Sequence, residues 1–338
     1  MRLQDRWGRR IGALLELVGV FVTGTLVARM IAGASGLASG GLRDAQPGAA
    51  VDYLALAFTT AANLLLRYGL ILGLAFVLGW RYGRRRWSSY GVSLADVPVR
   101  THIAIGVVLF AVGGFLPKLL VCLKDRVPLG AGPRHWDLIA TADSFEFWVY
   151  MAVGSFGLVP IVEELFFRGY VQTRLSEPFG VPAAIVMTAL LFTLSHRQYF
   201  IASVLGGGML LALFLASLLA GYARYRFDSL VPAIIAHSLG NVPVRGALQL
   251  VLLVLMAIVA GVAWRAVIAH ARELTALLRT RAVLAGSLVT VAVVVVVLSI
   301  AALGRVPLIV FGGLALIAGV ALARRERPGS TAPRHTPV

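Results

Sequence analysis

The amino-acid sequence predicts an all-α, polytopic bundle of about 8–10 transmembrane helices with both termini in the cytoplasm. Of its 338 residues, 59% are hydrophobic and only 14% are charged, a balance too apolar for an ordinary soluble domain. The apolar residues are gathered in runs long enough to cross about 30 Å of hydrocarbon. These runs are 11–31, 53–80, 102–122, 146–167, 181–199, 202–223, 229–244, 247–264, 283–303 and 306–323.

The basic residues support this orientation. The formal net charge is +16, and 29 of the 31 basic residues are arginines. They lie in alternate gaps between the apolar runs, as the positive-inside rule requires of cytoplasmic loops, rather than on one compact patch. We therefore expect contact with the bilayer and its anionic head groups, and no nucleic-acid partner. The predicted cytoplasmic gaps are 81–100, 168–174, 224–226, 265–281 and 324–334.

The first apolar run follows four arginines and resembles a signal peptide. It is long enough to span the bilayer and lacks a clear A-x-A cleavage site, so we expect an uncleaved first helix.

The single cysteine, Cys122, lies inside an apolar run. It therefore provides neither a disulfide framework nor a cysteine-based metal site.

The chain divides into five predicted segments. Helices and loops of residues 1–144 precede a central region, 145–264. In the connector 265–282, Arg265, Arg272 and Arg279 are seven residues apart on one helical face, as in an amphipathic helix at the membrane surface; a solvated connector would explain them equally. A valine-rich transmembrane hairpin, 283–323, and a disordered tail, 324–338, complete the chain.

Seven ionisable residues lie in the interior of the predicted spans, at least three residues from either end. Such residues are costly in hydrocarbon, and they usually face a protein interior or a wet cavity where they find partners. Four of the seven belong to three short polar clusters of the central region. The seven are Glu16, Arg67, Lys118, Glu163, Glu164, His196 and His237.

The first cluster is Glu163, Glu164 and Arg168. Glu164 and Arg168 are at positions i and i+4 and can form an ion pair on one helical face. Glu163 is rotated by about 100° from Glu164 and is left for another task. The alternative is that both acids only mark the cytoplasmic end of a helix. We expect this helix to continue to about Leu175, which would bring Glu163 toward the middle of the membrane.

The other two clusters place a histidine near an apolar helix end. Phe192 and His196 are one turn apart, as are His237 and Asn241. His237 and Asn241 can therefore project into one cavity and offer two hydrogen-bond donors. An interhelical polar clamp would use the same residues.

A carboxylate, two imidazoles and a carboxamide fit amide hydrolysis. A buried glutamate can take a proton from water, one imidazole can orient that water, and the second imidazole with the carboxamide can donate to an oxyanion. Alternatively, Glu163, His196 and His237 would be three ligands of a Zn²⁺ ion that activates the water. The residues alone leave both alternatives open. The sequence has no H-E-x-x-H motif and no transmembrane aspartate pair.

The three clusters, in this order, resemble the motifs of the CAAX protease and bacteriocin-processing (CPBP) family. That family includes type II CAAX prenyl endopeptidases and bacterial lysostaphin-resistance proteins. The resemblance covers residues 145–245 and implies a protease core at 145–264, a multi-pass location in the bacterial cell membrane, and a membrane protein or lipidated peptide as substrate. It implies that Glu163 activates the water, His196 assists, and His237 with Asn241 stabilises the oxyanion.

The same resemblance implies supporting roles for Glu164, Arg168 and Phe192, and leaves zinc open as a cofactor. Two other functions compete with the protease. A non-enzymatic membrane scaffold or immunity factor would use the same polar residues as clamps between helices. A proton-coupled carrier would use them as a relay, although the sequence contains no evident internal repeat.

Overall fold

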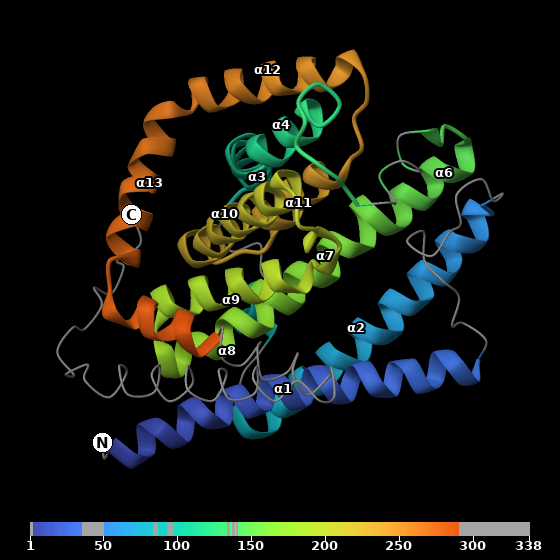
Figure 1. Ribbon diagram of the computed structural model, residues 1–338. Helices are drawn as coiled ribbons and strands as arrows, with labels where there is room; N and C mark the ends of the chain where they lie inside the picture. Colours follow the sequence, from blue (N-terminus) through green and yellow to red (C-terminus); the bar gives the residue numbers. More distant parts are fainter. Residues whose placement is uncertain are drawn as a thin grey trace.

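The computed structural model describes residues 3–35, 51–83, 87–92, 97–133, 136, 139 and 141–290, and these residues form helices and connections without a strand. The predicted all-α class is confirmed. The predicted tail and most of the predicted hairpin 283–323 lie outside the described residues, as does the C-terminus. Figure 1 shows the arrangement of the helices.

The elements follow one another from the N-terminus, with a final described helix over Arg281–Thr290. They are α1 (Leu3–Ala34), α2 (Tyr53–Gly83), the 3₁₀ turn η2 (Trp87–Tyr90), α3 (Val99–Gly113), α4 (Phe115–Leu123), α6 (Phe145–Tyr150), the π-helical η3 (Met151–Leu158), α7 (Val159–Glu164), the π-helical η4 (Leu165–Val171), α8 (Gln172–Phe179), α9 (Val181–Ser195), the 3₁₀ turn η5 (Arg197–Tyr199), α10 (Val204–Phe227), α11 (Val231–Asn241), α12 (Ala247–Val262) and α13 (Trp264–Leu278).

Four described helices are long and apolar enough to cross a membrane: Gly8–Ala34, Tyr53–Leu78, Phe145–Phe179 and Val204–Phe227. Two bent pairs raise the number to six, α3 with α4 at 45° and α12 with α13 at 78°. The predicted spans 181–199 and 229–244 are shorter than expected, because α9 has 15 residues and α11 has 11. At about 1.5 Å per residue, neither crosses the hydrocarbon alone.

Local sequence explains where α11 stops. Pro243 disfavours a helical conformation of the residue before it. Val242 accordingly leaves the helix with φ −64° and ψ 120°. Helix α11 therefore ends at Asn241 and has only 11 residues.

The helix from α6 to α8 is continuous from Phe145 to Phe179, and it carries the first polar cluster at its middle. The expectation that this helix continues to about Leu175 is confirmed, and the helix ends four residues later at Phe179. Two π-helical segments, η3 and η4, flank α7. Such wide turns are frequent at functional sites. Pro160, which cannot donate to the helical ladder, lies directly after η3.

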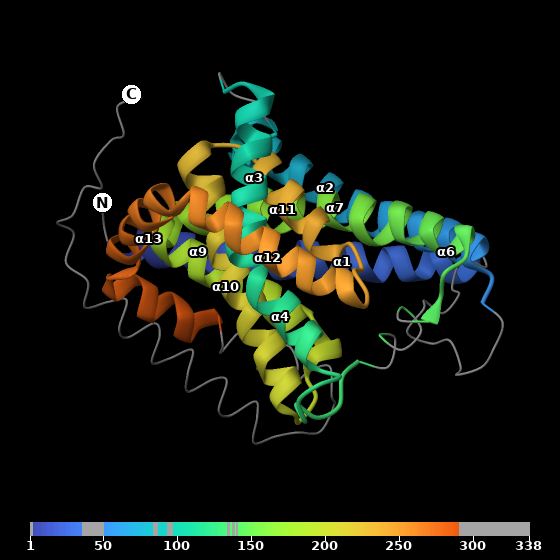
Figure 2. The same ribbon diagram turned by 90° about the horizontal axis from the view of Figure 1, so that it is seen from above.

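This central helix lies between two groups of helices. Helices α1 and α2 cover one side, whereas α11 contacts it from the other side and packs in turn on α3 (Figure 1). Figure 2 shows α12 crossing over α3 and α4. The central helix is therefore buried among helices from both halves of the sequence.

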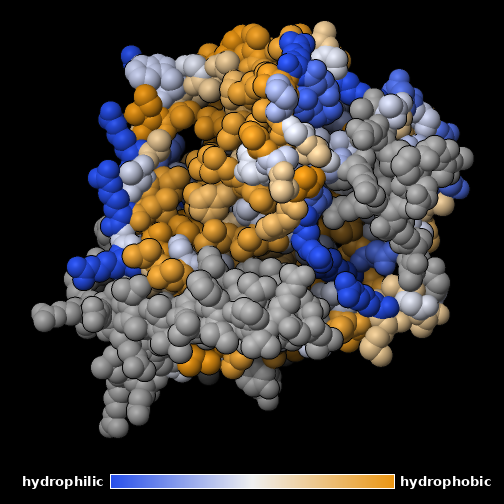
Figure 3. Space-filling view, viewed as in Figure 1, coloured by the Kyte–Doolittle hydropathy of each residue, from blue (hydrophilic) through white to orange (hydrophobic). Residues whose placement is uncertain are grey.

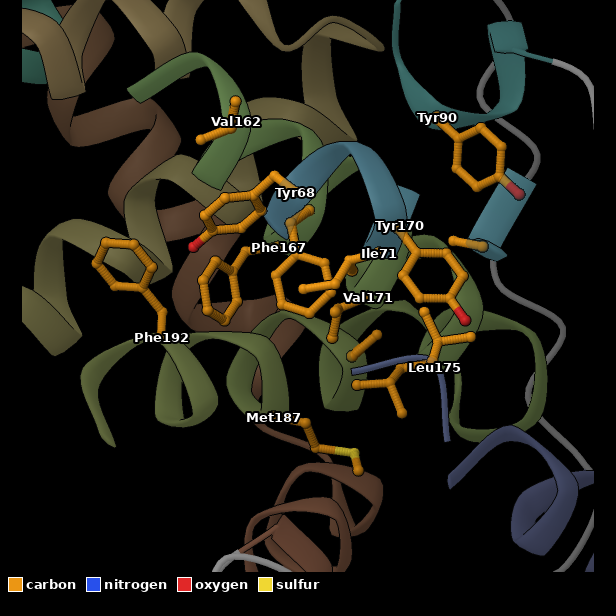
Figure 4. Close-up of a cluster of buried hydrophobic side chains, with 14 of the residues drawn as sticks. Tyr68, Ile71, Tyr90, Val162, Phe167, Tyr170, Val171, Leu175, Met187 and Phe192 are labelled. Carbon is orange, nitrogen blue, oxygen red and sulfur yellow. The ribbon is translucent and has the colours of Figure 1, made fainter. Parts of the chain in front are cut away.

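An aromatic core fixes the central helix to α2 and α9. Figure 4 shows Tyr68 and Ile71 of α2 facing Phe167 and Tyr170 of η4, with Phe192 of α9 beside Phe167. The rings of Phe167 and Phe192 meet edge to face with centroids 5.2 Å apart. Burial of such rings contributes strongly to stability and requires a specific ring geometry. The central helix, α2 and α9 are therefore held in defined relative positions.

Apolar side chains cover much of the surface that Figure 3 presents, from α12 toward the central helix. On α12, Val254, Leu255 and Ile258 are each more than half exposed. Large contiguous apolar surface of this kind marks contact with lipid or with another protein. Together with the candidate spans, it supports an integral, multi-pass membrane protein.

Gly106 allows α3 to approach α11 closely. A methyl group at this position would lie 2.7 Å from the Cβ of Ile235 and 3.1 Å from the carbonyl oxygen of Pro232. Both atoms belong to α11 and have little freedom to move. We expect Gly106→Ala to destabilise the fold by about 1–3 kcal/mol, as overpacking does, and to reduce any activity that depends on α11.

Thermal unfolding in detergent measures the first effect. Gly207→Ala on α10 is the matched control, since no atom lies within 4 Å of the added methyl group. Equal melting temperatures for the two variants would contradict the close packing of α3 on α11.

Candidate active site

Glu164 and Arg168 form a buried ion pair. Nη1 of Arg168 donates to Oε1 of Glu164 at 2.8 Å, and both side chains are 2% exposed. Nη2 of Arg168 donates to the hydroxyl of Ser217 on α10 at 2.7 Å, and the guanidinium lies over the Phe192 ring at 4.4 Å. The predicted i, i+4 pair is confirmed. The prediction that Arg168 belongs to a cytoplasmic loop is wrong, because burial and these three partners fix it inside the bundle.

Glu163 points away from this pair and is 17% exposed. Its Oε2 lies 3.9 Å from Nε2 of His237, and this buried oxygen has no hydrogen-bond partner among the described residues. Tyr68 on α2 interacts with the Glu163 side chain through its hydroxyl. Because Arg168 hydrogen-bonds to Glu164 and not to Glu163, the two adjacent acids differ in their surroundings.

His237 on α11 lies between the two glutamates. Its Nδ1 is 2.9 Å from Oε1 of Glu164. The carboxylate can only accept, so Nδ1 carries a proton and donates it. Nε2 then faces Glu163 as an acceptor in the neutral ring or as a donor in the imidazolium. With His237 protonated, the charges of Glu163, Glu164, Arg168 and His237 sum to zero.

Asn241, one turn after His237, also meets the central helix. Its Nδ2 donates to the carbonyl oxygen of Ser155 in η3 at 2.8 Å. A carboxamide has two N–H donors, so this contact fixes the orientation of the group and leaves it a second donor. His237 and Asn241 thus face the same helix, as their spacing predicts.

His196 follows the last residue of α9. Its Nδ1 is 2.8 Å from the carbonyl oxygen of Phe192, which can only accept, so the proton of the neutral ring is on Nδ1. The imidazole ring lies 4.5 Å from the Phe192 ring and is stacked with Tyr199 at 6.4 Å. The Phe192 ring also meets His237 edge to face at 5.8 Å. Phe192 therefore contacts both imidazoles.

The three predicted zinc ligands do not form a metal-binding group. In the part of the chain that the structure describes, no set of three or more His, Cys, Asp or Glu side chains is arranged to hold a metal ion. Nδ1 of His237 is bonded to Glu164, and Nδ1 of His196 is bonded to a backbone carbonyl, so Nε2 of each ring remains open, as in a zinc-ligating histidine. Because the three side chains do not converge among the described residues, no step of a reaction is assigned to a metal.

Sequence reasoning missed three contributors to the site. Ser217 is 2% exposed in α10. A serine within an apolar run is a signal in the sequence that could have indicated a polar partner. Tyr68 follows Arg67, one of the ionisable residues within the predicted spans. Ser155 contributes its backbone carbonyl, for which side-chain chemistry gives no signal. Each depends on packing between segments far apart in the chain.

Residues 145–243 match the model of a family described as Rce1-like type II CAAX prenyl endopeptidases. The matched region contains all three clusters, from Glu163 to Asn241, and confirms the resemblance that their spacing predicts. No curated protein and no solved structure matches the chain. The family match supports a CAAX-type membrane protease in general terms.

Proposed function

We propose that this protein is an intramembrane endopeptidase in which Glu163 activates a water molecule to hydrolyse a peptide bond of a membrane protein or lipidated peptide. One observation carries the proposal. Oε2 of Glu163 is buried, has no hydrogen-bond partner among the described residues and faces Nε2 of His237 at 3.9 Å. At that separation, one water molecule fits within hydrogen-bonding distance of both atoms.

In the proposed reaction, the Glu163 carboxylate takes a proton from this water as its oxygen attacks the scissile carbonyl carbon. The carbonyl oxygen becomes an oxyanion, which accepts hydrogen bonds from Nε2–H of protonated His237 and the second amide N–H of Asn241. Glu163 then delivers its proton to the amide nitrogen, and the C–N bond breaks. The products are a carboxylic acid and an amine, and the sum is the addition of one water.

The supporting residues hold the groups that take part in these steps. Glu164 accepts from Nδ1–H of His237 and fixes the orientation of the ring, in the way that a buried carboxylate orients a catalytic histidine. The positive charge of Arg168 already compensates the negative charge of Glu164. His237 can therefore interact with the substrate without leaving Glu164 uncompensated. His196, with its proton on Nδ1, has Nε2 as the acceptor that can orient the water.

The experiment is cleavage by purified protein in detergent or bilayer discs, with a library of transmembrane and lipidated peptides. New peptide termini identified by mass spectrometry in the wild-type reaction are the expected result. A wild-type protein that is folded and cleaves no member of either library contradicts the proposal.

A non-enzymatic scaffold is the second candidate, since the contacts of His237 with Glu164 and of Asn241 with Ser155 do join helices. A scaffold does not require the open carboxylate oxygen of Glu163. Unchanged unfolding of Glu163→Gln together with loss of cleavage separates the enzyme from the scaffold.

Metal removal is expected to leave the activity intact, because the described residues do not form a metal-binding group. Dialysis against a chelator, followed by elemental analysis, should yield protein with far less than one zinc per chain and at least about half of the initial kcat, whereas loss of a zinc that activates water removes catalysis. An authentic zinc protease in the same buffer is the control. Activity that disappears with the metal and returns only on addition of Zn²⁺ would contradict this expectation.

A further inference from the structure

Lys118 is an ionisable residue of the predicted spans to which the proposed mechanism assigns no role. It lies on α4, and its Nζ donates to the carbonyl oxygen of Val242 at 2.8 Å. No carboxylate in the described part of the chain forms an ion pair with it. The only other lysine of the chain, Lys124, pairs with Asp125 at 2.7 Å. Lys118 is therefore a cation in an apolar span whose partner is one backbone carbonyl.

The carbonyl that Lys118 binds belongs to the residue directly after Asn241. The last carbonyls of a helix have no partner within the helix and attract cations. Backbone outside a helix at membrane depth must also be satisfied by neighbouring groups. Lys118 meets both needs at the end of α11, because Val242 is the first residue that leaves the helix.

Apolar contacts hold the rest of α11 but do not orient its end. Ala236 and Leu239 pack in a cluster with Phe110 of α3 and Met256 of α12. In the described part of the chain, the hydrogen bonds that join Asn241 and Val242 to other helices are those of Asn241 with Ser155 and of Val242 with Lys118. The Asn241 amide therefore depends on a segment that is tied at one end to η3 and at the other to α4.

We propose that Lys118 is a positioning residue for the oxyanion side of the site, holding Asn241 through the hydrogen bond to Val242. This inference rests on the proposed function of Asn241. It assigns Lys118 no contact with the substrate, and its effect is expected to pass entirely through Asn241.

The first measurement does not depend on activity. The chain contains two asparagines, Asn63 and Asn241, so asparagine labelled with ¹⁵N gives two side-chain amide signals. Asn63 donates to a carbonyl of its own helix α2 and serves as the internal reference. We expect Lys118→Met to move the Asn241 signal and leave that of Asn63 unchanged. Lys118→Arg should retain the wild-type position, since arginine keeps a long cationic donor, and Lys124→Met should leave both signals in place.

The second measurement is a double-mutant cycle on cleavage. Loss of one oxyanion donor costs about 10²–10³-fold in kcat, and Asn241→Ala sets that limit here. Lys118→Met should lower kcat by about 10- to 100-fold with KM nearly unchanged, and Lys118→Arg should recover most of it. Combining Lys118→Met with Asn241→Ala should reduce kcat no further than Asn241→Ala alone, because the two changes remove one effect.

An unmoved Asn241 signal in Lys118→Met overturns the inference, and so do rate losses that multiply in the double variant. A wild-type protein that cleaves nothing overturns the proposed function instead. In that case, the Asn241 signal still decides whether Lys118 orients this amide.

Discussion

Glu163→Gln is expected to lower kcat for peptide cleavage by about 10²–10⁴-fold, the range that a general base contributes. Glutamine keeps the size of the side chain and removes its ability to take a proton. Oε2 of Glu163 has no hydrogen-bond partner among the described residues, so the substitution breaks no hydrogen bond of that atom. The melting temperature should therefore stay close to that of the wild type. Initial rates on the best library peptide and thermal unfolding in the same detergent measure the two effects.

Glu164→Gln is the informative comparison, since it makes the same chemical change, carboxylate to carboxamide, at the adjacent residue. It removes the charge that partners Arg168 and His237, and should lower both stability and activity. Glu177→Gln, on α8, is the control for removing a carboxylate from an exposed ion pair, since Glu177 pairs with Arg174 and is 44% exposed. Our assignment is wrong if Glu163→Gln retains wild-type kcat, or if Glu163→Gln and Glu164→Gln lose stability equally.

The contacts that follow from spacing along one helix could be predicted from the sequence. Glu164 and Arg168 are neighbours in any helix, and so are His237 and Asn241. The helix that contains Glu163 is long and apolar, so its continuation to about Leu175 could also be predicted. The family resemblance rests on the same local spacings, which explains why it could be stated before the fold was known.

The contacts between helices could not be predicted in this way. Nothing in the spacing indicates that Nδ1 of His237 bonds to Glu164 while Nε2 faces Glu163, because that choice depends on how α11 rotates against the central helix. The short length of α11 depends on Pro243, which ends the helix although the apolar run around it continues. The zinc alternative also depended on the relative positions of three helices, which spacing along one helix does not give.

We therefore infer different roles for the two adjacent acids, a structural role for Glu164 and a catalytic role for Glu163. Glu164 joins Arg168, Ser217 and His237 into a buried network that connects the central helix to α10 and α11. Glu163 remains outside that network, and its Oε2, which has no hydrogen-bond partner among the described residues, lies 3.9 Å from Nε2 of His237. The network fixes the helix turn that carries both acids, whereas a reactive carboxylate must be free to bind water. The same helix turn provides both, because successive side chains are about 100° apart.

Removing one member of that network is expected to produce the largest loss of stability. Arg168→Met should lower the free energy of unfolding by about 3–5 kcal/mol, the cost of leaving a buried charge without its partner. Glu164 would then be a buried carboxylate beside Glu163, with His237 as the remaining cation, and the hydroxyl of Ser217 would lose its donor. Denaturant titration in mixed micelles measures this difference.

Two further variants test the cause of that loss. Removing both charges with Glu164→Gln and Arg168→Met should recover a substantial part of the stability lost in Arg168→Met, because an uncompensated charge costs more than an absent pair. Arg174→Met removes ion pairs with Glu16 and Glu177 in which the side chains are more exposed than those of the buried pair, and should cost less than Arg168→Met. Two results would contradict a stabilising role of the buried pair. One is a loss in the free energy of unfolding for Arg168→Met that is no larger than that for Arg174→Met. The other is a double variant whose loss equals the sum of the losses of Arg168→Met and Glu164→Gln.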